Sequence, residues 1–540
     1  MNRTPEQQVE DLIARHSRHE PLVSVLCETH DRAAVAFRFV DADMRCTELT
    51  HGELADRSRQ LAAGLVGIGL GRGDRVATLM DKSEDYVATL LAIWRLGAVH
   101  VPLFTAFAYA AIELRVSGSK AKALVFDDRY RSNLRLDGGE DLHSSGITMI
   151  AAGEAETGEI ALADLFRDVP PEGIPAPAIG PDDPIIHIFT SGTTGKAKGV
   201  VVPKSALACF EVYGRFALDL RKDDVFWNAA DPGWAYGLYF AILLPMLSGI
   251  PSLLLKPRFS AELAVALLET FEVTNFAGAP TIYRALMACE RQPSGVNLRC
   301  ASSAGEPLTP DVNQWAPAAL GVAVHDQYGQ TEASMLINNH QHPDLRSPLK
   351  PGSMGRPMPG WTAEILAEDE DRPLPANEKG RLAFDLERSP LAWFSGYTGI
   401  SAQEAGKISA DGRWYITGDV AYRDEDGDFF FASRDDDVII MAGYRIGPFD
   451  IESVLVDHPA VAEAAVVARP DRSKGEIVAA YVVLNKDRAP SNDLAAELQA
   501  WVKTRYSAHA YPRVVEFVET LPRTPAGKIQ RYRLRQLQSA

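Results

Sequence analysis

The sequence has few cysteines and a shortage of positive charge, and each shortage excludes a class of function. The five cysteines, Cys27, Cys46, Cys209, Cys289 and Cys300, lie far apart, and no two have the C-x-x-C spacing. This argues against a structural zinc site and a disulfide framework, so we expect a cytoplasmic protein. Lys and Arg number 55 against 72 Asp and Glu, a formal net charge of -17. Because DNA would meet net repulsion, we expect no nucleic-acid partner.

The sequence also lacks a long unbroken apolar run. The N-terminal segment mixes acids and bases and has no apolar core of the kind that a signal peptide needs. The uncharged stretch 235–255 approaches membrane-spanning length, but Pro245, Gly249 and Pro251 interrupt it. We therefore expect no membrane span, and we interpret this stretch as a buried helix, a turn and a strand. No G-x-S-x-G occurs, which excludes the commonest serine-hydrolase elbow.

A chain of 540 residues is too long for one ordinary core, so more than one domain is expected. Up to about residue 169, helical patterns alternate with short apolar strands, and a second such round begins at 185–189. This alternation predicts an α/β fold with two mostly parallel sheets. Residues 352–431 read as short strands with frequent turns, which predicts a small β subdomain. The last hundred or so residues predict a compact α+β domain.

The sharpest local signal is the loop TSGTTGKAKG, Thr190 to Gly199, directly after the apolar strand. Its glycines free the backbone to wrap a polyanion, and Lys196 and Lys198 supply positive charge. The loop lacks the G-x-x-x-x-G-K-[ST] spacing of a Walker loop, with Ala197 where the hydroxyl would stand. The pattern therefore predicts a different kind of phosphate-cradling loop.

Two other patterns favour structural interpretations. The glycine-rich stretch Gly67 to Gly73 has no third glycine at the dinucleotide spacing and follows a helical segment, so we expect a loop that ends a helix. His340 and His342 lack further ligands at suitable spacing, so we expect a polar loop there and no metal site.

The phosphate-cradling loop resembles that of the adenylate-forming superfamily of acyl-CoA synthetases, luciferases and nonribosomal adenylation domains. The further motifs of that superfamily follow in order: GEP (305–307), YGQTE (328–332), GSMGRP (352–357), YITGD (415–419), SRDD (433–436), GYRIG (443–447) and PRTPAGKIQR (522–531). A chance match of all these across essentially the whole chain is hard to sustain. The stretches DPGWAYG (231–237) and GAPTIYRAL (278–286) are most similar to acetyl- and medium-chain acyl-CoA synthetases.

This resemblance implies that the protein is an AMP-forming ligase that uses ATP, Mg²⁺ and a carboxylic acid, with coenzyme A as the expected acceptor. Lys528 would reach the substrate carboxylate and the α-phosphate, and Glu332 with Thr331 would hold the magnesium ion. Asp419 would accept hydrogen bonds from the ribose hydroxyls, with Arg434 nearby, and the adenine would lie against residues 305–307 and the ring of Tyr328. The implied nucleotide site comprises Thr190, Ser191, Gly192, Thr193, Thr194, Gly195, Lys196, Gly305, Glu306, Pro307, Asp326, Gln327, Tyr328, Gln330, Thr331, Asp419 and Arg434.

The resemblance also implies two moving parts: an adenylation domain, residues 1–435, and a mobile C-terminal domain, residues 436–540. Asp436 would be the hinge, and the coenzyme A tunnel would be lined by Gly443, Tyr444 and Arg445. Rotation about this hinge would let one site serve two half-reactions.

The implied acyl pocket is formed by Trp234, Tyr236, Ala304 and Gly329. Acetate-specific relatives carry tryptophan at the position of Gly329, so we expect a medium-chain or aromatic acid to be preferred over acetate. The chain departs from the family's usual TETG after Thr331-Glu332, with Ala333-Ser334-Met335 instead, which leaves the neighbouring pocket wall open.

Two alternatives remain open at this stage. The adenylation could be kept with a different acceptor: a carrier-protein thiol, an amine, or nitrite, as in the diazotase branch of the superfamily. A non-catalytic nucleotide sensor belongs to another class, but its expected mark is loss of the lysine or the glutamate, and Lys528 and Glu332 are both present. The sequence leaves the oligomeric state open.

Overall fold

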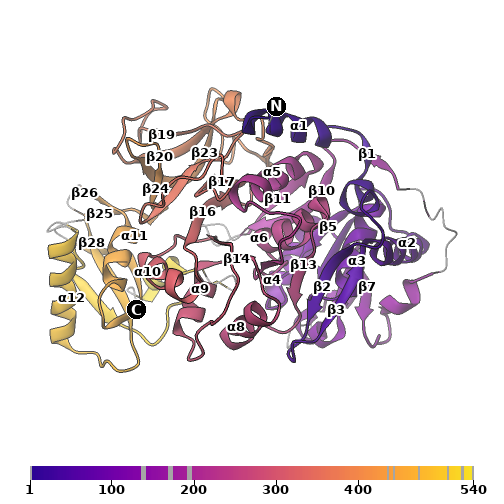
Figure 1. Ribbon diagram of the computed structural model, residues 1–540, viewed down its shortest axis with the longest axis horizontal. Helices are drawn as coiled ribbons and strands as arrows, with labels where there is room; N and C mark the ends of the chain where they lie inside the picture. The colour runs from indigo at the N-terminus through magenta and orange to yellow at the C-terminus, as the bar shows by residue number, and fades with distance from the viewer. Residues whose placement is uncertain are drawn as a thin grey trace.

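The fold is described from a computed structural model of the chain (Figure 1). The residues that the structure describes are 3–135, 141–167, 174, 176–190, 197–434, 437–441, 444–471, 475–506, 510–524 and 528–537.

The first large sheet has nine strands in the order β22-β21-β11-β10-β5-β4-β6-β7-β8. Its parallel part is β10 (Pro184–Thr190), β5 (Val99–Pro102), β4 (Arg75–Leu79), β6 (Ala123–Asp127), β7 (Thr148–Ala152) and β8 (Ile160–Ala161). The antiparallel strands β11 (Lys198–Pro203), β21 (Gly396–Tyr397) and β22 (Ile400–Ser401) extend one edge. The first predicted parallel sheet is therefore confirmed.

The second large sheet has thirteen strands in the order β19-β20-β23-β24-β18-β17-β16-β15-β14-β12-β13-β2-β3. Its parallel part is β2 (Val35–Val40), β13 (Ser252–Leu255), β12 (Phe226–Asn228), β14 (Asn275–Gly278), β15 (Cys300–Ala304) and β16 (Val324–Gln330). The strand β3 (Cys46–Thr50) closes one edge in the antiparallel sense. The second predicted parallel sheet is also confirmed, with a strand from the N-terminal part of the chain built into it.

The predicted small β subdomain is present, but it is hydrogen-bonded to the second sheet. Antiparallel pairing runs without a break from β16 through β17 (Ser334–Asn338), β18 (Ser353–Pro357), β24 (Phe429–Arg434), β23 (Trp414–Arg423) and β20 (Gly380–Asp385) to β19 (Ala363–Leu366). This continuity fixes β23 and β24 relative to the end of β16.

Local sequence signals explain where the helices of the first half begin and end. Helix α3 (Glu84–Arg95) starts at the N-cap Ser83, whose hydroxyl accepts from the Tyr86 N–H, and its residues from Tyr86 onward are buried. Helix α2 (His51–Gly67) starts with a capping box at Thr50. It ends as predicted at the Gly67–Gly73 loop, where Gly69 takes a φ of 88°.

The remaining helices cover the sheets or pack between them (Figure 1). They are α1 (Pro5–His16), α4 (Tyr109–Ser119), α5 (Leu207–Val212), α6 (Ala235–Gly237), α7 (Leu244–Ser248), α8 (Ala261–Thr270), α9 (Pro280–Ala288) and α10 (Pro310–Ala319). The stretch 235–255 is a buried helical run, a turn at the left-handed Gly249 and the strand β13, as expected. None of the described helices is long and apolar enough to cross a membrane.

The C-terminal part forms a third sheet with its own apolar clusters, at the left of Figure 1. Its strands are β25 (Ile439–Met441), β26 (Tyr444–Ile446), β27 (Val461–Asp471), β28 (Gly475–Leu484) and β29 (Val514–Phe517). Helices α11 (Pro448–Val456), α12 (Asn492–Arg505) and α13 (Arg531–Leu537) accompany them. This agrees with the predicted α+β composition.

Candidate active site

The predicted site residues gather where strands of the second sheet end. Residues 305–307 follow β15, residues 328–330 end β16, and Asp419 and Arg434 are cross-strand partners on β23 and β24. Ligands of α/β sheets bind at the carboxyl ends of the parallel strands. The sheet therefore brings together motifs that lie more than a hundred residues apart in the sequence.

The buried carboxylate of Asp419 is the centre of this group. Its Oδ1 accepts from Arg434 Nη1 at 2.9 Å, and its Oδ2 accepts from Gln330 Nε2 at 2.8 Å and from the Tyr328 hydroxyl. Gln330 is itself held by the Tyr415 hydroxyl, which donates to its Oε1 at 2.7 Å. Both oxygens of Asp419 are thus aimed by neighbours, as a residue that binds a diol requires.

Glu332 is buried just beyond the end of β16. Its Oε1 accepts from the Tyr397 hydroxyl at 2.7 Å, and its other oxygen has no hydrogen-bond partner among the residues that the structure describes. No group of three or more His, Cys, Asp or Glu in the described part of the chain could hold a metal ion. A single carboxylate nevertheless fits Mg²⁺, which keeps waters and binds through one or two carboxylates plus substrate phosphates.

Four cations lie around these carboxylates. The Lys528 ammonium is close enough to Glu306, Asp419 and Glu332 to be stabilised by them, while desolvation by the surrounding protein still lowers its pKa. The Lys528 N–H is held by the Thr524 hydroxyl at 3.1 Å, which closes its loop. The other three cations are Arg434, Lys198 and Lys407. The site thus has the charge to hold a polyanion.

The loop 305–307 is anchored from two sides. Arg284 Nη2 lies 2.6 Å from a carboxylate oxygen of Glu306, and the Leu308 N–H donates to Asp326 Oδ2 at 3.3 Å. Burial raises the pKa of Asp326 to about 7, and nearby Glu306 adds to the rise, against two backbone N–H donors that lower it. Gly305 has a φ of 112°, a conformation that favours glycine. The Asp326 carboxylate therefore anchors the loop by accepting a hydrogen bond from the backbone N–H of Leu308.

Of the predicted acyl-pocket residues, Ala304 ends β15 and Gly329 lies near the end of β16, whereas Trp234 is the N-cap of α6 and Tyr236 lies in α6. Trp234 packs against Phe104 and Phe107, with ring centroids 5.2 Å and 5.6 Å away, and its buried indole N–H has no partner among the described residues. The Tyr236 hydroxyl lies 2.8 Å from the hydroxyl of Tyr213. This wall is aromatic but carries polar groups as well.

The side chain of one predicted nucleotide-site residue, Gln327, lies away from the group around Asp419. The Gln327 side chain accepts from the Tyr213 hydroxyl and donates to Ser302 Oγ at 3.3 Å, so it is used on the Tyr236 side and not beside Asp419. Neighbouring strand residues point to opposite faces, so Gln327 cannot share a face with Asp326 and Tyr328.

Steric contacts explain why residue 329 is a glycine. A Cβ there would lie 2.4 Å from the Ser334 carbonyl oxygen and 2.7 Å from Met335 Sδ. A tryptophan at this position would therefore require β17 to move, and it would not simply fill empty space. Ala304, which is buried at the end of β15, is the better position at which to alter the pocket.

Several predicted site residues lie outside the described part of the chain. They are Ser191, Gly192, Thr193, Thr194, Gly195, Lys196, the hinge residue Asp436 and Gly443. Tyr444 and Arg445 are placed in β26 by their backbone only. Thr190 and Lys198 are paired across β10 and β11, so the phosphate-cradling loop connects two antiparallel strands.

Comparison with known proteins agrees with this geometry. The model of the AMP-binding enzyme family matches residues 26–397, and that of the AMP-binding enzyme C-terminal domain matches residues 450–528. The chain belongs to the AMP-binding enzyme family. The resemblance to adenylate-forming enzymes is thereby confirmed, and this AMP-binding enzyme is an AMP-forming ligase of the acyl-CoA synthetase type.

Individual relatives of this AMP-binding enzyme match over nearly its whole length. An acetyl-coenzyme A synthetase of Bacillus subtilis is 34% identical over 513 residues, covering 93% of this chain and 87% of the relative. A solved acyl-CoA synthetase of Brucella canis is 40% identical, with a TM-score of 0.76 over 99% of this chain and 98% of that one. A benzoate CoA ligase from Burkholderia xenovorans is 28% identical, with a TM-score of 0.81 over 98% and 99%.

Sequence reasoning missed three residues of this site. Tyr397 and Lys407 belong to no motif that we used, and the sequence offered no signal for them. Tyr415 begins the YITGD motif, so its position next to Gln330 could have been anticipated from the motif's place in the series.

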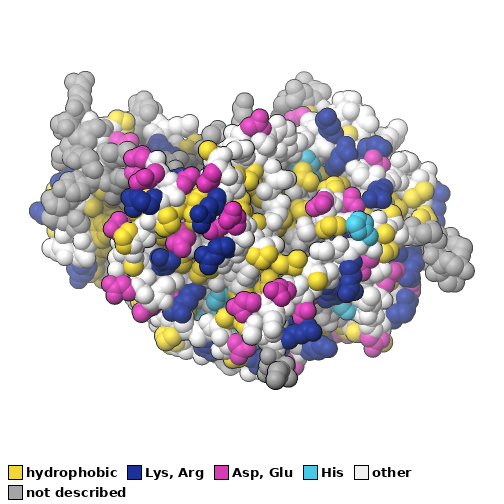
Figure 2. Space-filling model, turned by 90° about the horizontal axis from the view of Figure 1, so that it is seen from above, with side chains coloured by type: hydrophobic (Ala, Val, Ile, Leu, Met, Phe, Trp, Pro, Cys, Tyr) yellow, Lys and Arg dark blue, Asp and Glu magenta, His cyan; other side chains and the backbone are white. Residues whose placement is uncertain are grey.

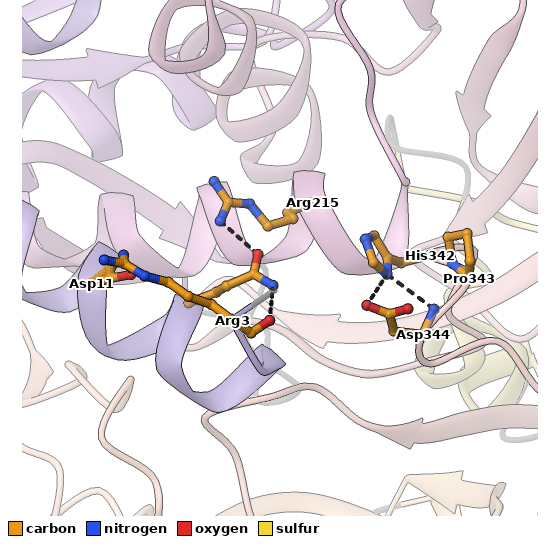
Figure 3. A pocket seen from close by; sticks show the side chains of 7 residues that line it. Arg3, Asp11, Arg215, His342, Pro343 and Asp344 are labelled. Atoms are coloured by element: carbon orange, nitrogen blue, oxygen red, sulfur yellow. Dashed lines mark hydrogen bonds and ion pairs between the residues drawn. The ribbon is translucent and has the colours of Figure 1, made fainter. Parts of the chain in front are cut away.

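A depression of about 550 Å³ lies elsewhere on this AMP-binding enzyme, beside α1 (Figure 3). Its charged side chains are already engaged: Arg3 pairs with Asp11, Arg215 Nη1 donates to Gln8 at 2.9 Å, and His342 lies near Asp344. His340 Nε2 lies 3.3 Å from the Pro357 carbonyl, so both histidines are in a polar loop, as expected. The face seen in Figure 2 intersperses positive and negative side chains. We assign no function to these surfaces.

Proposed function

We propose that this enzyme activates a medium-chain or aromatic carboxylic acid with ATP and transfers the acyl group to coenzyme A. One observation carries the proposal. Lys528, from the C-terminal part of the chain, is close enough to Glu306, Asp419 and Glu332 of the large part for their charges to act on its ammonium. A non-catalytic nucleotide sensor would have no need of this lysine.

In the first step a carboxylate oxygen of the acid attacks the α-phosphorus of ATP. The new O–P bond forms as the bond from that phosphorus to the bridging oxygen breaks, and pyrophosphate leaves with the electron pair. Lys528 offsets the charge that accumulates on the phosphoryl oxygens, and Asp419 holds the ribose. Mg²⁺, held by Glu332 with Thr331 beside it, would neutralise charge on the ATP phosphates when bound.

In the second step the thiol of coenzyme A loses its proton to solvent and its sulfur attacks the acyl carbon. The C–S bond forms, the C–O bond to the phosphate breaks, and AMP leaves.

We place the boundary between the adenylation domain and the C-terminal domain at residues 435 and 436, with Asp436 as the hinge. The change from the thirteen-stranded sheet to the third sheet between β24 and β25 supports this boundary. Rotation there would withdraw Lys528 and bring residues 443–445 to the thiol tunnel.

The substrate class rests on the pocket walls. The ring of Trp234, backed by Phe104 and Phe107, offers an apolar aromatic surface, and Ala304 contributes only a methyl group. Each methylene of a longer acid that becomes buried adds about 0.8 kcal/mol of transfer free energy, which acetate forgoes. The names of the relatives point both ways, since one is an acetyl-coenzyme A synthetase and another a benzoate CoA ligase.

The experiment measures pyrophosphate release over a panel of carboxylic acids, each with and without coenzyme A, and identifies the acyl product. We expect the highest kcat/KM for a medium-chain or aromatic acid and AMP release that depends on coenzyme A. Ala304→Leu should shift the preference toward short acids, with its melting temperature as a check on folding. A preference for acetate would contradict the substrate class. Pyrophosphate release with turnover only on an amine, on nitrite or on a carrier-protein thiol would contradict the acceptor.

A further inference from the structure

Lys407 lies inside the candidate site although it belongs to none of the motifs. It follows β22 in a loop, and its side chain is half-buried. Its Nζ donates to the Thr417 carbonyl oxygen at 2.6 Å, and the same oxygen accepts from Gln330 Nε2 at 3.0 Å. Because Gln330 also donates to Asp419, two hydrogen-bonded groups, the Thr417 carbonyl and the Gln330 amide, link Lys407 to the carboxylate at the centre of the site.

Lys407 and Arg434 converge on one small space. Gly418 lies between Thr417 and Asp419 with a φ of 78°. A Cβ built there would be 3.6 Å from Lys407 Nζ and 3.7 Å from Arg434 Nη2; apart from Gly418 and its two chain neighbours, no other described residue has an atom within 4 Å of that point. Two cationic nitrogens that approach the same point form a geometry that suits an anion.

The charges around Lys407 are those around Lys528. Burial lowers the pKa of Lys407, Glu332 and Asp419 raise it, and Arg434 and Lys198 lower it further. Glu332, Asp419 and Arg434 are also the neighbours of Lys528. An ammonium has three N–H donors, and Lys407 uses one of them on Thr417 with no second hydrogen-bond partner among the described residues. The two lysines therefore experience the charges of the same three residues, Glu332, Asp419 and Arg434.

We propose that Lys407, together with Arg434, contacts the α-phosphate of the nucleotide and remains on it through both half-reactions. This inference rests on the proposed function. Lys407 precedes the proposed hinge, so it would stay with the adenylate when Lys528 is withdrawn. When the thiol sulfur bonds to the acyl carbon and the C–O bond to the phosphate breaks, the electron pair stays on the AMP oxygen. Lys407 offsets that charge.

The test uses the full-length enzyme and four variants. Lys407→Met removes the charge and the hydrogen bond, Lys407→Gln keeps a donor for Thr417 without the charge, and Lys407→Arg keeps both. Lys122→Met is the matched control. Lys122 forms an ion pair with Asp74 at 2.7 Å, and the two residues immediately precede β6 and β4. Thioester formation is measured from a supplied acyl-adenylate, pyrophosphate exchange reports the first step, and calorimetry gives the Kd for AMP.

We expect Lys407→Met and Lys407→Gln to slow both half-reactions by tenfold or more and to weaken AMP binding, because loss of one preorganised donor to a developing anion costs on the order of 100-fold in rate. Lys407→Arg should recover much of the loss, and Lys122→Met should behave as wild type. A Gln variant equal to wild type would mean that Lys407 only supports Thr417, and unchanged AMP binding in Lys407→Met would also overturn the proposal. AMP binding does not depend on the acid or the acceptor, so it separates this inference from a failure of the proposed function.

Discussion

Replacing Asp326 by asparagine should change how the stability of the enzyme depends on pH. Asp326 is buried at the end of β16, where its pKa is raised to about 7, mainly by desolvation. In the unfolded chain an aspartate titrates near about 3.9. Between these values the native state keeps the proton and the unfolded state has lost it, so stability is lost as the pH rises from about 4 to about 7.

The size of the effect follows from the same values. At about 1.4 kcal/mol per pKa unit, wild type should lose ~3 kcal/mol between pH 5 and pH 8 through this one group. Asparagine cannot ionise and should not show this loss. It has one oxygen where Asp326 uses two, on the N–H groups of Leu308 and Gln327, and the lost hydrogen bond should cost about 1 kcal/mol at every pH.

The assay is urea unfolding of wild type and Asp326→Asn at pH 5, 6, 7 and 8, with the exposed Asp43→Asn as a surface control. The pH dependence common to all three proteins cancels in the differences. We expect Asp326→Asn to have about the stability of wild type at pH 5, where the lost hydrogen bond roughly offsets what wild type has already lost above pH 4, and to be more stable than wild type at pH 8. Parallel pH curves for wild type and Asp326→Asn would refute the reasoning, because Asp326 would then be ionised in the native state throughout.

Three further predictions follow from the same contacts. Lys528→Ala should abolish adenylate formation, measured by pyrophosphate exchange, and leave thioester formation from a supplied acyl-adenylate nearly intact; equal loss in both steps would contradict its role in the first step alone. Gly355→Ala should lower the free energy of unfolding in urea by more than about 3 kcal/mol, because its φ is 90° and a Cβ would lie 2.2 Å from the Asn338 carbonyl oxygen. The control Gly412→Ala, with a φ of 77° and no other described residue near its Cβ, should lower it by only about 1 kcal/mol. Similar costs for the two variants would show that the contact at residue 355 is relieved. Lys379→Met removes a partly exposed ion pair to Asp450 at 2.7 Å, so pyrophosphate exchange should fall by no more than about fivefold, and a loss of a hundredfold would mean that this contact fixes the placement of the C-terminal domain.

Much of the fold could be predicted from the sequence because its local signals agree with one another. The alternation of helices and apolar strands gave two parallel sheets, and Ser83 and Thr50 mark helix starts that the structure contains. The pairing of β2 with β13 could not be foreseen, since Arg38 and Leu253 are brought together only by the packing of the whole large part. Strand pairing at such separation leaves no periodic trace in the sequence.

The candidate site divides in the same way. Motif order brought Asp419, Tyr328 and Gln330 together correctly, while strand alternation, had we applied it, would have placed the Gln327 side chain on the other face. The second glycine of GSMGRP also has a structural explanation, because a Cβ at Gly355 would lie 2.2 Å from the Asn338 carbonyl oxygen. A motif therefore contains residues required for packing as well as residues required for chemistry, and only the three-dimensional contacts distinguish the two.

The charge of the site shows why the overall composition is a poor guide to ligands. The chain has a formal net charge of -17, yet four cations, Lys198, Lys407, Arg434 and Lys528, surround three carboxylates, Glu306, Glu332 and Asp419. Before any ligand binds, this local charge is positive, and in a partly desolvated space each of these charges acts more strongly than on the surface. One of the four comes from the C-terminal part of the chain. If that part moves away as proposed, the site loses one of these cations, which weakens the hold on an anionic leaving group at the stage when AMP has to be released.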